Sequence, residues 1–366
     1  MSDDVDATRE MANLTVRDDA PAPAPAQAWP GGALPPWDVR LDEPSHVYTI
    51  HGDWAHGFHG VDTPEKKNKI SHDVVPSSRR VVSGTSLLKP CFAPFDADAV
   101  LDAYHENWQS PTNRRHAEYG GKSREEIKAM WTRNAREKAS EGTRMHALFE
   151  RFYVTGKSPS EVTTDEAEDD DARAALEEDA RTFEREWTQF EHFTRNHCAR
   201  EDVLFAEMRL FSPKHRVAGT ADVVARGTRP NGVIVYDFKR CKDSCAENAF
   251  VLGWPKHGEY KYGCHEIRGN NHGKYRVQLN LYAELLRLNY GVEVEKMCIV
   301  RCHGERVRGD EAEVIEVAPC EDVVKNILNK RERELKVRRM FAAAAAAARV
   351  CVHFARKKRA KLRAAP

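Results

Sequence analysis

The stretch from Val217 to Lys242 constrains the fold most, because it predicts two strands joined by a turn and puts charged side chains on both. Asp222 lies in the first strand, and Asp237 and Lys239 lie near the end of the second, where alternation points both to one face. The apolar run from residue 233 to 236 makes the second strand a buried one. Charges there are costly unless a counter-charge sits among them, and a divalent cation such as Mg²⁺ takes carboxylate oxygens.

The order of elements around this stretch predicts an α/β fold. Hydrophobic periods and turn residues predict strands at Val203–Phe211, Val217–Arg226, Gly232–Lys239, Lys296–His303 and Val314–Val317. Capping residues predict two helices, one that begins after Asp96 or Asp98 and one that begins at the Ser123–Glu126 capping box and runs on through Glu150. An apolar stripe predicts a third helix along Leu176, Phe183, Trp187 and Phe190. Two more helices are expected at Tyr275–Tyr290 and from Glu321 through the alanines at 342–348. A short strand is expected near residues 46–50.

Composition divides the chain into three parts. The Pro/Ala-rich segment 1–44 is predicted to be a disordered tail. Residues 45–340 are predicted to form one domain, with a helical part at 95–198 and a core at 200–305. An Ala-rich, basic tail follows at 341–366. Segments 161–171 and 242–272 are predicted to be loops, the first acidic and the second mixing Tyr260, Tyr262 and Trp254 with cations.

The distribution of charge and the cysteine content indicate the possible partners and the cellular compartment of this protein. Net charge is zero, yet residues 321–366 carry fourteen Lys/Arg and only four Asp/Glu. This basic end suits phosphate contact, a nuclear-localisation-like role, or a merely solvated helix end. Nine scattered cysteines without a signal segment indicate free thiols in a reducing compartment. No apolar run is long enough to span a membrane, so an intracellular protein is expected, with nucleus or cytoplasm left open.

Four motifs occur in a fixed order: G-T-R-M-H-A-L-F-E ending at Glu150, A-G-T-A-D ending at Asp222, D-F-K ending at Lys239, and Q-L-N-L-Y ending at Tyr282. Together they resemble the PD-(D/E)xK nuclease superfamily, in particular the RecB-like and lambda-exonuclease-like branch found in phages and large DNA viruses. Ala221 replaces the proline of the superfamily's pattern, at a position that varies. The spacing of fifteen between the two aspartates is slightly long, which the turn between the strands can absorb.

The resemblance implies a restriction-endonuclease-like core, with a central mixed sheet flanked by helices. It implies catalytic roles for Asp222, Asp237, Lys239, Gln278 and Tyr282. It implies Mg²⁺, with Mn²⁺ as an alternative, held by ligands drawn from His146, Glu150, Glu207, Asp222, Asp237 and the backbone carbonyl of Phe238. Some nucleases of this kind hold an iron–sulfur cluster, so the cysteines keep that alternative to ordinary buried thiols.

The implied function is metal-dependent hydrolysis of DNA, by an exonuclease acting from a free end in recombination, repair or replication. A structure-selective or restriction-like endonuclease, and an inactive DNA-binding protein of the same fold, are the alternatives. Each motif alone has an ordinary explanation: charges beside a hairpin turn, a solvated helical pair, rim residues of a helix, or an ion pair of Glu207 with Arg209. Four motifs in order, each on its expected element, favour the nuclease.

Overall fold

The computed structural model describes residues 29–35, 37–42, 47–52, 81–92, 94–161, 170–241, 264, 267, 269–305 and 311–363. In chain order the strands are β1 (Trp37–Asp42), β2 (Val47–Gly52), β3 (Val82–Ser83), β4 (Val203–Ser212), β5 (Val217–Arg226), β6 (Gly232–Arg240), β7 (Glu293–Cys302) and β8 (Glu313–Glu316). The helices are α1 (Gly84–Leu88), α2 (Ala97–Trp108), α3 (His116–Tyr119), α4 (Arg124–Thr155), α5 (Asp170–Thr182), α6 (Glu184–Asn196), α7 (Asn271–Tyr290) and α8 (Glu321–Arg363), with short 3₁₀ turns at Lys89–Cys91, Pro159–Glu161 and Arg200–Asp202.

The central sheet forks at β5. One edge of β5 pairs antiparallel with β4 along nearly its whole length. On the other edge, the first two residues pair with β3 and the last four, Val223–Arg226, pair with β6. β6 then continues to Arg240 beside the parallel strand β7, and β8 closes the far edge. The fork opens just beyond the pair Val223–Tyr236, so Asp222 and Asp237 stand at its mouth.

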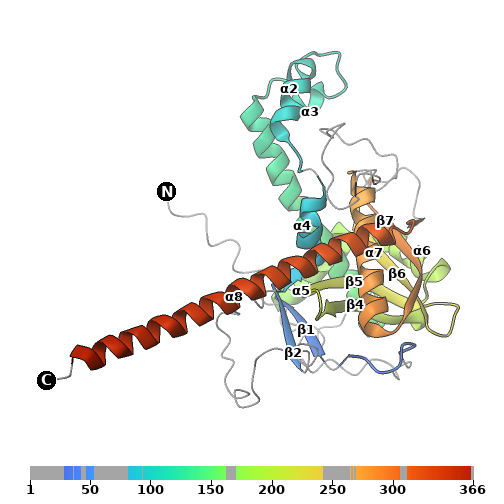
Figure 1. Cartoon of the computed structure of the whole chain (residues 1–366). Helices are drawn as coiled ribbons and strands as arrows, with labels where there is room; N and C mark the ends of the chain where they lie inside the picture. Colours follow the sequence, from blue (N-terminus) through green and yellow to red (C-terminus); the bar gives the residue numbers. More distant parts are fainter. Residues whose placement is uncertain are drawn as a thin grey trace.

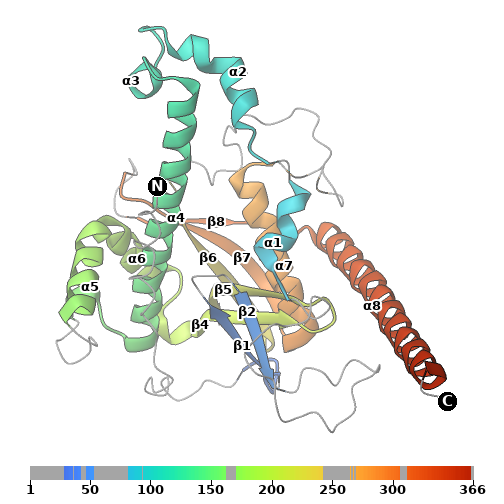
Figure 2. The ribbon, with the colours of Figure 1, turned by 90° about the vertical axis from the view of Figure 1, so that its left-hand side faces the viewer.

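Two helical layers cover the mixed sheet, as the sequence predicts. On one face α7, α1 and the start of α8 pack on apolar side chains such as Val235 and Ile299. On the other face α4 and α6 pack on Tyr236, Phe238 and Val300. Figure 2 shows this division, with α4, α5 and α6 on one side of the strands and α1 and α7 on the other. The fold is therefore α/β, with the fork between the layers.

Two parts extend from this body. At the far end of α4, α2 and α3 form a small head with its own core of Val100, Leu101, Trp108, Tyr119 and Ile127 (Figure 1). At the other end of the chain α8 leaves the body as one long helix (Figures 1 and 2). The capping box predicted at Ser123 is confirmed, and so is the helix predicted through the alanine run.

Several boundaries differ from the sequence prediction. Order begins before residue 45, because Trp29 is buried and donates its Nε1–H to the Tyr290 carbonyl at 2.8 Å, and because β1 precedes that point. Residues 1–28 lie outside the described residues, as do 162–169 of the acidic loop and 242–263 of the second loop, with its aromatic and basic side chains.

The single helix predicted across Phe183 is two helices. Phe183 leaves helical geometry, with φ −109° and ψ 22°, and its ring is completely buried. The guanidinium of Arg144 lies 5.3 Å from the centre of that ring, so the break seats an aromatic side chain against α4. The prediction of free thiols is also wrong at one residue, because Cys241 is disulfide-bonded. Among the described residues Cys91, Cys198, Cys264, Cys298, Cys302 and Cys320 are free.

Candidate metal centre

Asp222 occupies the mouth of the fork and replaces a missing strand partner. Where β5 and β6 separate, the Phe238 N–H has no carbonyl opposite it. The Asp222 carboxylate takes that position and accepts the Phe238 N–H through Oδ2 at 2.7 Å. A buried backbone donor needs such an acceptor. One oxygen of Asp222 is thereby fixed to the end of β6, and the side chain is only about a tenth exposed.

Glu207 faces Asp222 from the neighbouring strand. The register of β4 against β5 pairs Ala206 with Val223 and Met208 with Ala221, which places Glu207 opposite Asp222. Glu207 has a φ of +48°, in the left-handed region that non-glycine residues seldom occupy. Such strain costs about 1–3 kcal/mol and is concentrated at functional sites. Here it accompanies two carboxylates that turn toward the same histidine.

That histidine, His146, comes from α4. One turn further along the helix, Phe149 stacks on Phe190 with ring centres 4.1 Å apart and meets Phe238 edge to face at 5.0 Å. This packing holds α4 over the end of β6. His146 Nε2 lies 2.9 Å from the Phe238 carbonyl oxygen, and Nδ1 lies 3.5 Å from Asp222 Oδ2 and 3.7 Å from Glu207 Oε1.

The resulting group of His146, Glu207 and Asp222 has the donor set of a metal centre. One ligand atom from each residue lies within 4.8 Å of the others, and it is the only such group in the described part of the chain. Burial acts to lower the pKa of His146, but attraction to the carboxylates of Asp222 and Glu207 outweighs it and raises the pKa to about 9. Without a metal, an imidazolium therefore balances the two carboxylates, and its Nε2–H donates to the Phe238 carbonyl.

Asp237 and Lys239 form a buried ion pair beside this group. Lys239 Nζ lies 2.5 Å from Asp237 Oδ2, donates to the Phe238 carbonyl at 3.1 Å, and lies 5.0 Å from the centre of the Tyr275 ring. Both residues point to the α7 face, as strand alternation predicts. The group of three does not include Asp237, which the sequence prediction counted as a metal ligand.

Burial and the neighbouring charges together shift the pKa values of these residues. Burial raises the pKa of Asp237 to about 6, although the Lys239 ammonium opposes that shift. Burial also raises the pKa of Asp222, against the attraction of His146. For Lys239, burial alone would lower the pKa, but Asp237 and Asp222 raise it above its ordinary value. Lys239 is therefore a fixed cation at neutral pH and a poor proton acceptor.

The remaining predicted residues lie around the group of three. Tyr282 is buried on α7 with its ring against Gly219, where an added Cβ would stand 2.4 Å from Cε1. It braces β5 close to Asp222. Gln278 is half-buried on α7, and its side chain makes no hydrogen bond to any described residue. Glu150, one helical turn beyond His146 on α4, is half-buried and outside the group.

The residues present fit a divalent ion. Both oxygens of Asp237 are buried and accept no hydrogen bond from any described residue, because the Lys239 contact lacks hydrogen-bond geometry. A buried carboxylate in that state favours a nearby cation, which the Lys239 ammonium already provides. An imidazole nitrogen beside carboxylate oxygens is a donor set that divalent transition-metal ions accept, whereas Mg²⁺ prefers oxygen alone.

Sequence reasoning missed Tyr275, whose ring lies beside the Lys239 ammonium. A signal was available, because Tyr275 lies three residues before Gln278 and seven before Tyr282, on the same stripe of α7.

Comparison with models of protein families finds no match for this chain, and comparison with curated proteins finds none. No helix in the described residues is long and apolar enough to cross a membrane.

Proposed function

We propose that this protein is a metal-dependent DNA nuclease of the PD-(D/E)xK type. The observation that carries the proposal is the meeting of side chains from four elements at the sheet fork: His146 from α4, Glu207 and Asp222 from the adjacent strands β4 and β5, and Lys239 from β6. Motifs far apart in sequence contribute to one small volume. That convergence supports a functional site more strongly than any single motif does.

His146, Glu207 and Asp222 would hold the ion, which is Mg²⁺ or Mn²⁺. A bound ion supplies Lewis acidity, which lowers the pKa of an attacking water and polarises the phosphoryl oxygen. Lys239, kept cationic by Asp237, would neutralise charge that develops on the phosphate. Asp237 and the Tyr275 ring hold the ammonium in place. Because the set includes an imidazole, Mn²⁺ is expected to support activity at least as well as Mg²⁺.

DNA is the proposed substrate, and attack from a free end in recombination, repair or replication is the proposed mode. Both come from the motif resemblance. An endonuclease could use the same site, and a comparison of linear with covalently closed DNA separates the two. Cleavage of covalently closed circular DNA would contradict an exonuclease, because such DNA has no free end.

The proposal is tested by digestion of end-labelled single- and double-stranded DNA with Mg²⁺, Mn²⁺ or EDTA. Asp222→Asn is the sharpest variant, because the amide oxygen still accepts the Phe238 N–H while the charge is lost. It should lower activity by at least about 100-fold. Glu316→Gln, at an exposed carboxylate on the edge strand β8, is the matched control and should retain activity. Activity that persists in EDTA, or in Asp222→Asn, would reject the mechanism.

A further inference from the structure

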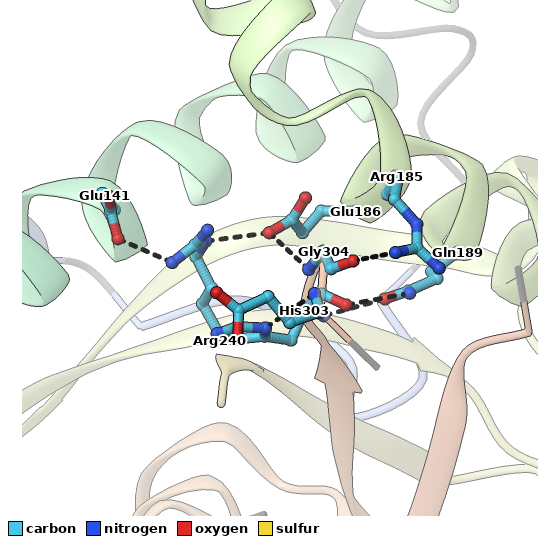
Figure 3. Close-up of polar contacts among 8 residues, drawn as sticks. Glu141, Arg185, Glu186, Gln189, Arg240, His303 and Gly304 are labelled. Atoms are coloured by element: carbon cyan, nitrogen blue, oxygen red, sulfur yellow. Dashed lines mark hydrogen bonds and ion pairs between the residues drawn. The ribbon is translucent and has the colours of Figure 1, made fainter. Parts of the chain in front are cut away.

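A second charged cluster lies behind Lys239, on the opposite face of β6. Arg240 ends the strand and points toward α4 and α6, because successive side chains alternate. Its Nε donates to Glu186 Oε1 of α6 at 2.9 Å, and its Nη1 donates to Glu141 Oε2 of α4 at 2.6 Å (Figure 3). One guanidinium therefore joins three elements of the fold.

The Glu186 end of this bridge is rigidly anchored. Glu186 is 1% exposed and also accepts the Gly304 N–H at 2.8 Å. Next to it, Gln189 makes two hydrogen bonds with the His303 backbone, donating at 3.1 Å and accepting at 2.8 Å. Figure 3 shows these side chains of α6 lined up along the backbone just after β7. They satisfy backbone groups where the sheet has ended, so α6 is fixed to β7.

The Glu141 end lies where α4 meets the body. Apart from the half-buried Asn134, the residues from Thr132 to Ser140 are exposed, so that part of α4 forms a bare stalk below the head. Glu141 is 36% exposed and His146 follows five residues later. The ion pair with Arg240 therefore holds α4 at Glu141, a point between the exposed stalk and His146.

We infer that the Glu186–Arg240–Glu141 bridge is a positioning device for His146. This inference rests on the proposed metal-dependent function. His146 must keep Nδ1 toward the carboxylates of Asp222 and Glu207, and a small rotation or slide of α4 would withdraw it. In some proteins a buried ion pair selects one arrangement among alternatives, and we assign that role to this bridge. Motion of the head, transmitted along the bare stalk, would otherwise reach His146 directly.

Glu141 is the residue to change. Loss of Arg240 or Glu186 leaves an unpaired buried charge and risks unfolding the protein. Glu141 is partly exposed, so Glu141→Ala breaks only the contact with α4. Glu141→Gln keeps an acceptor at the same place and should rescue the effect. Glu137→Ala is the matched control, since it removes an exposed glutamate one turn earlier on the same helix.

Two measurements on the full-length protein decide the inference. Mn²⁺ affinity, titrated with Mn²⁺ alone, should fall about tenfold in Glu141→Ala, within the range for groups that orient a ligand. Hydrogen exchange in EDTA should quicken across residues 141–150 in that variant. Glu137→Ala and Glu141→Gln should match the wild type in both measurements.

The outcomes separate the two claims. If the wild type binds Mn²⁺ and Glu141→Ala binds it equally well with unchanged exchange, the positioning role is overturned and the proposed function stands. If the wild type binds no Mn²⁺, the proposed metal centre fails, and the bridge's role in holding its histidine fails with it.

Discussion

At the scale of single residues, the left-handed backbone of Glu207 links strain to the candidate site. Glycine adopts a φ of +48° without a steric penalty, whereas glutamate does not. Glu207 also raises the pKa of Asp222 by repulsion. In the metal-free fold the strain and this repulsion both cost stability, while the attraction of Glu207 to a protonated His146 offsets part of that cost.

In EDTA, Glu207→Gly should have a free energy of unfolding about 1 kcal/mol higher than Glu207→Ala, because both variants lack the carboxylate and only glycine adopts this backbone without strain. Mn²⁺ binding should weaken in the glycine variant. Glu207→Ala is the control, since it removes the carboxylate and keeps the strain. Urea unfolding of the three proteins measures the difference. A glycine variant no more stable than the alanine variant would show that the backbone stores no strain there.

His215 gives a pH dependence outside the candidate site. It is buried, its Nδ1 lies 2.9 Å from Ser212 Oγ, and burial lowers its pKa from 6.5 to about 4. Between these values the unfolded chain binds a proton that the folded chain does not. Stability from this residue is thus complete above pH 6.5 and is lost as the pH falls to 4.

The loss attributable to His215 should be roughly 2 kcal/mol between pH 6.5 and pH 4. His215→Asn keeps a hydrogen-bonding group near Ser212 and does not titrate. Unfolding free energies of both proteins, measured across this range, should therefore fall less steeply in the variant. Parallel curves would mean that the pKa of His215 is the same in the folded and the unfolded chain.

At the scale of elements, an aromatic stack sets the position of α4 and α6. Phe190 is completely buried and lies 4.1 Å from Phe149 and 5.6 Å from Phe238, ring centre to ring centre. Phe190→Ala should destabilise the protein by about 3–5 kcal/mol, the usual cost of removing a buried phenylalanine. Phe341→Ala, at a side chain 72% exposed on α8, should cost less than about 0.5 kcal/mol. Equal losses in urea unfolding would contradict the stack's role.

Elements with strong local patterns were predictable from the sequence. β5 has the predicted bounds, β6 runs one residue longer, and α7 ends at a left-handed Gly291. Long-range packing was not predictable. The break at Phe183 interrupts a continuous helical period, because the ring reaches α4. Trp29 is buried through contacts with Tyr290 and Phe205, which lie far from it in the sequence.

The candidate site was predictable to a similar degree. The resemblance carried by the ordered motifs predicts His146, Glu207, Asp222 and Lys239 as site residues. In the structure these four side chains lie close together at the sheet fork. Whether Asp237 joins the ligands or pairs with Lys239 depends on how far the strands diverge, which no local pattern encodes. Tyr275 and Arg240 act across elements, and therefore only a three-dimensional arrangement reveals them.

At the scale of the whole molecule, charge is concentrated on α8. From Val337 to the C-terminus the chain has nine Lys/Arg and no Asp/Glu. The described side chains from Lys336 to Arg349 are all exposed, so none of these side chains belongs to the core. Such an extension suits contact with a polyanion through charge alone.

Removal of residues 337–366 should therefore leave thermal stability unchanged and weaken binding to a DNA duplex in EDTA by roughly tenfold at low salt. The slope of log affinity against log salt should become shallower, because fewer counterions are released. Binding curves at several salt concentrations measure both quantities. An unchanged slope would assign α8 a role that does not involve DNA.

The central claim is that His146, Glu207 and Asp222 form a metal centre at the sheet fork. Anomalous diffraction from crystals soaked in Mn²⁺ tests it most directly. We predict one strong peak bounded by the His146 imidazole and the carboxylates of Glu207 and Asp222, absent in Asp222→Asn. Crystals of the wild type that take up Mn²⁺ elsewhere, with no peak at the fork, would contradict the claim.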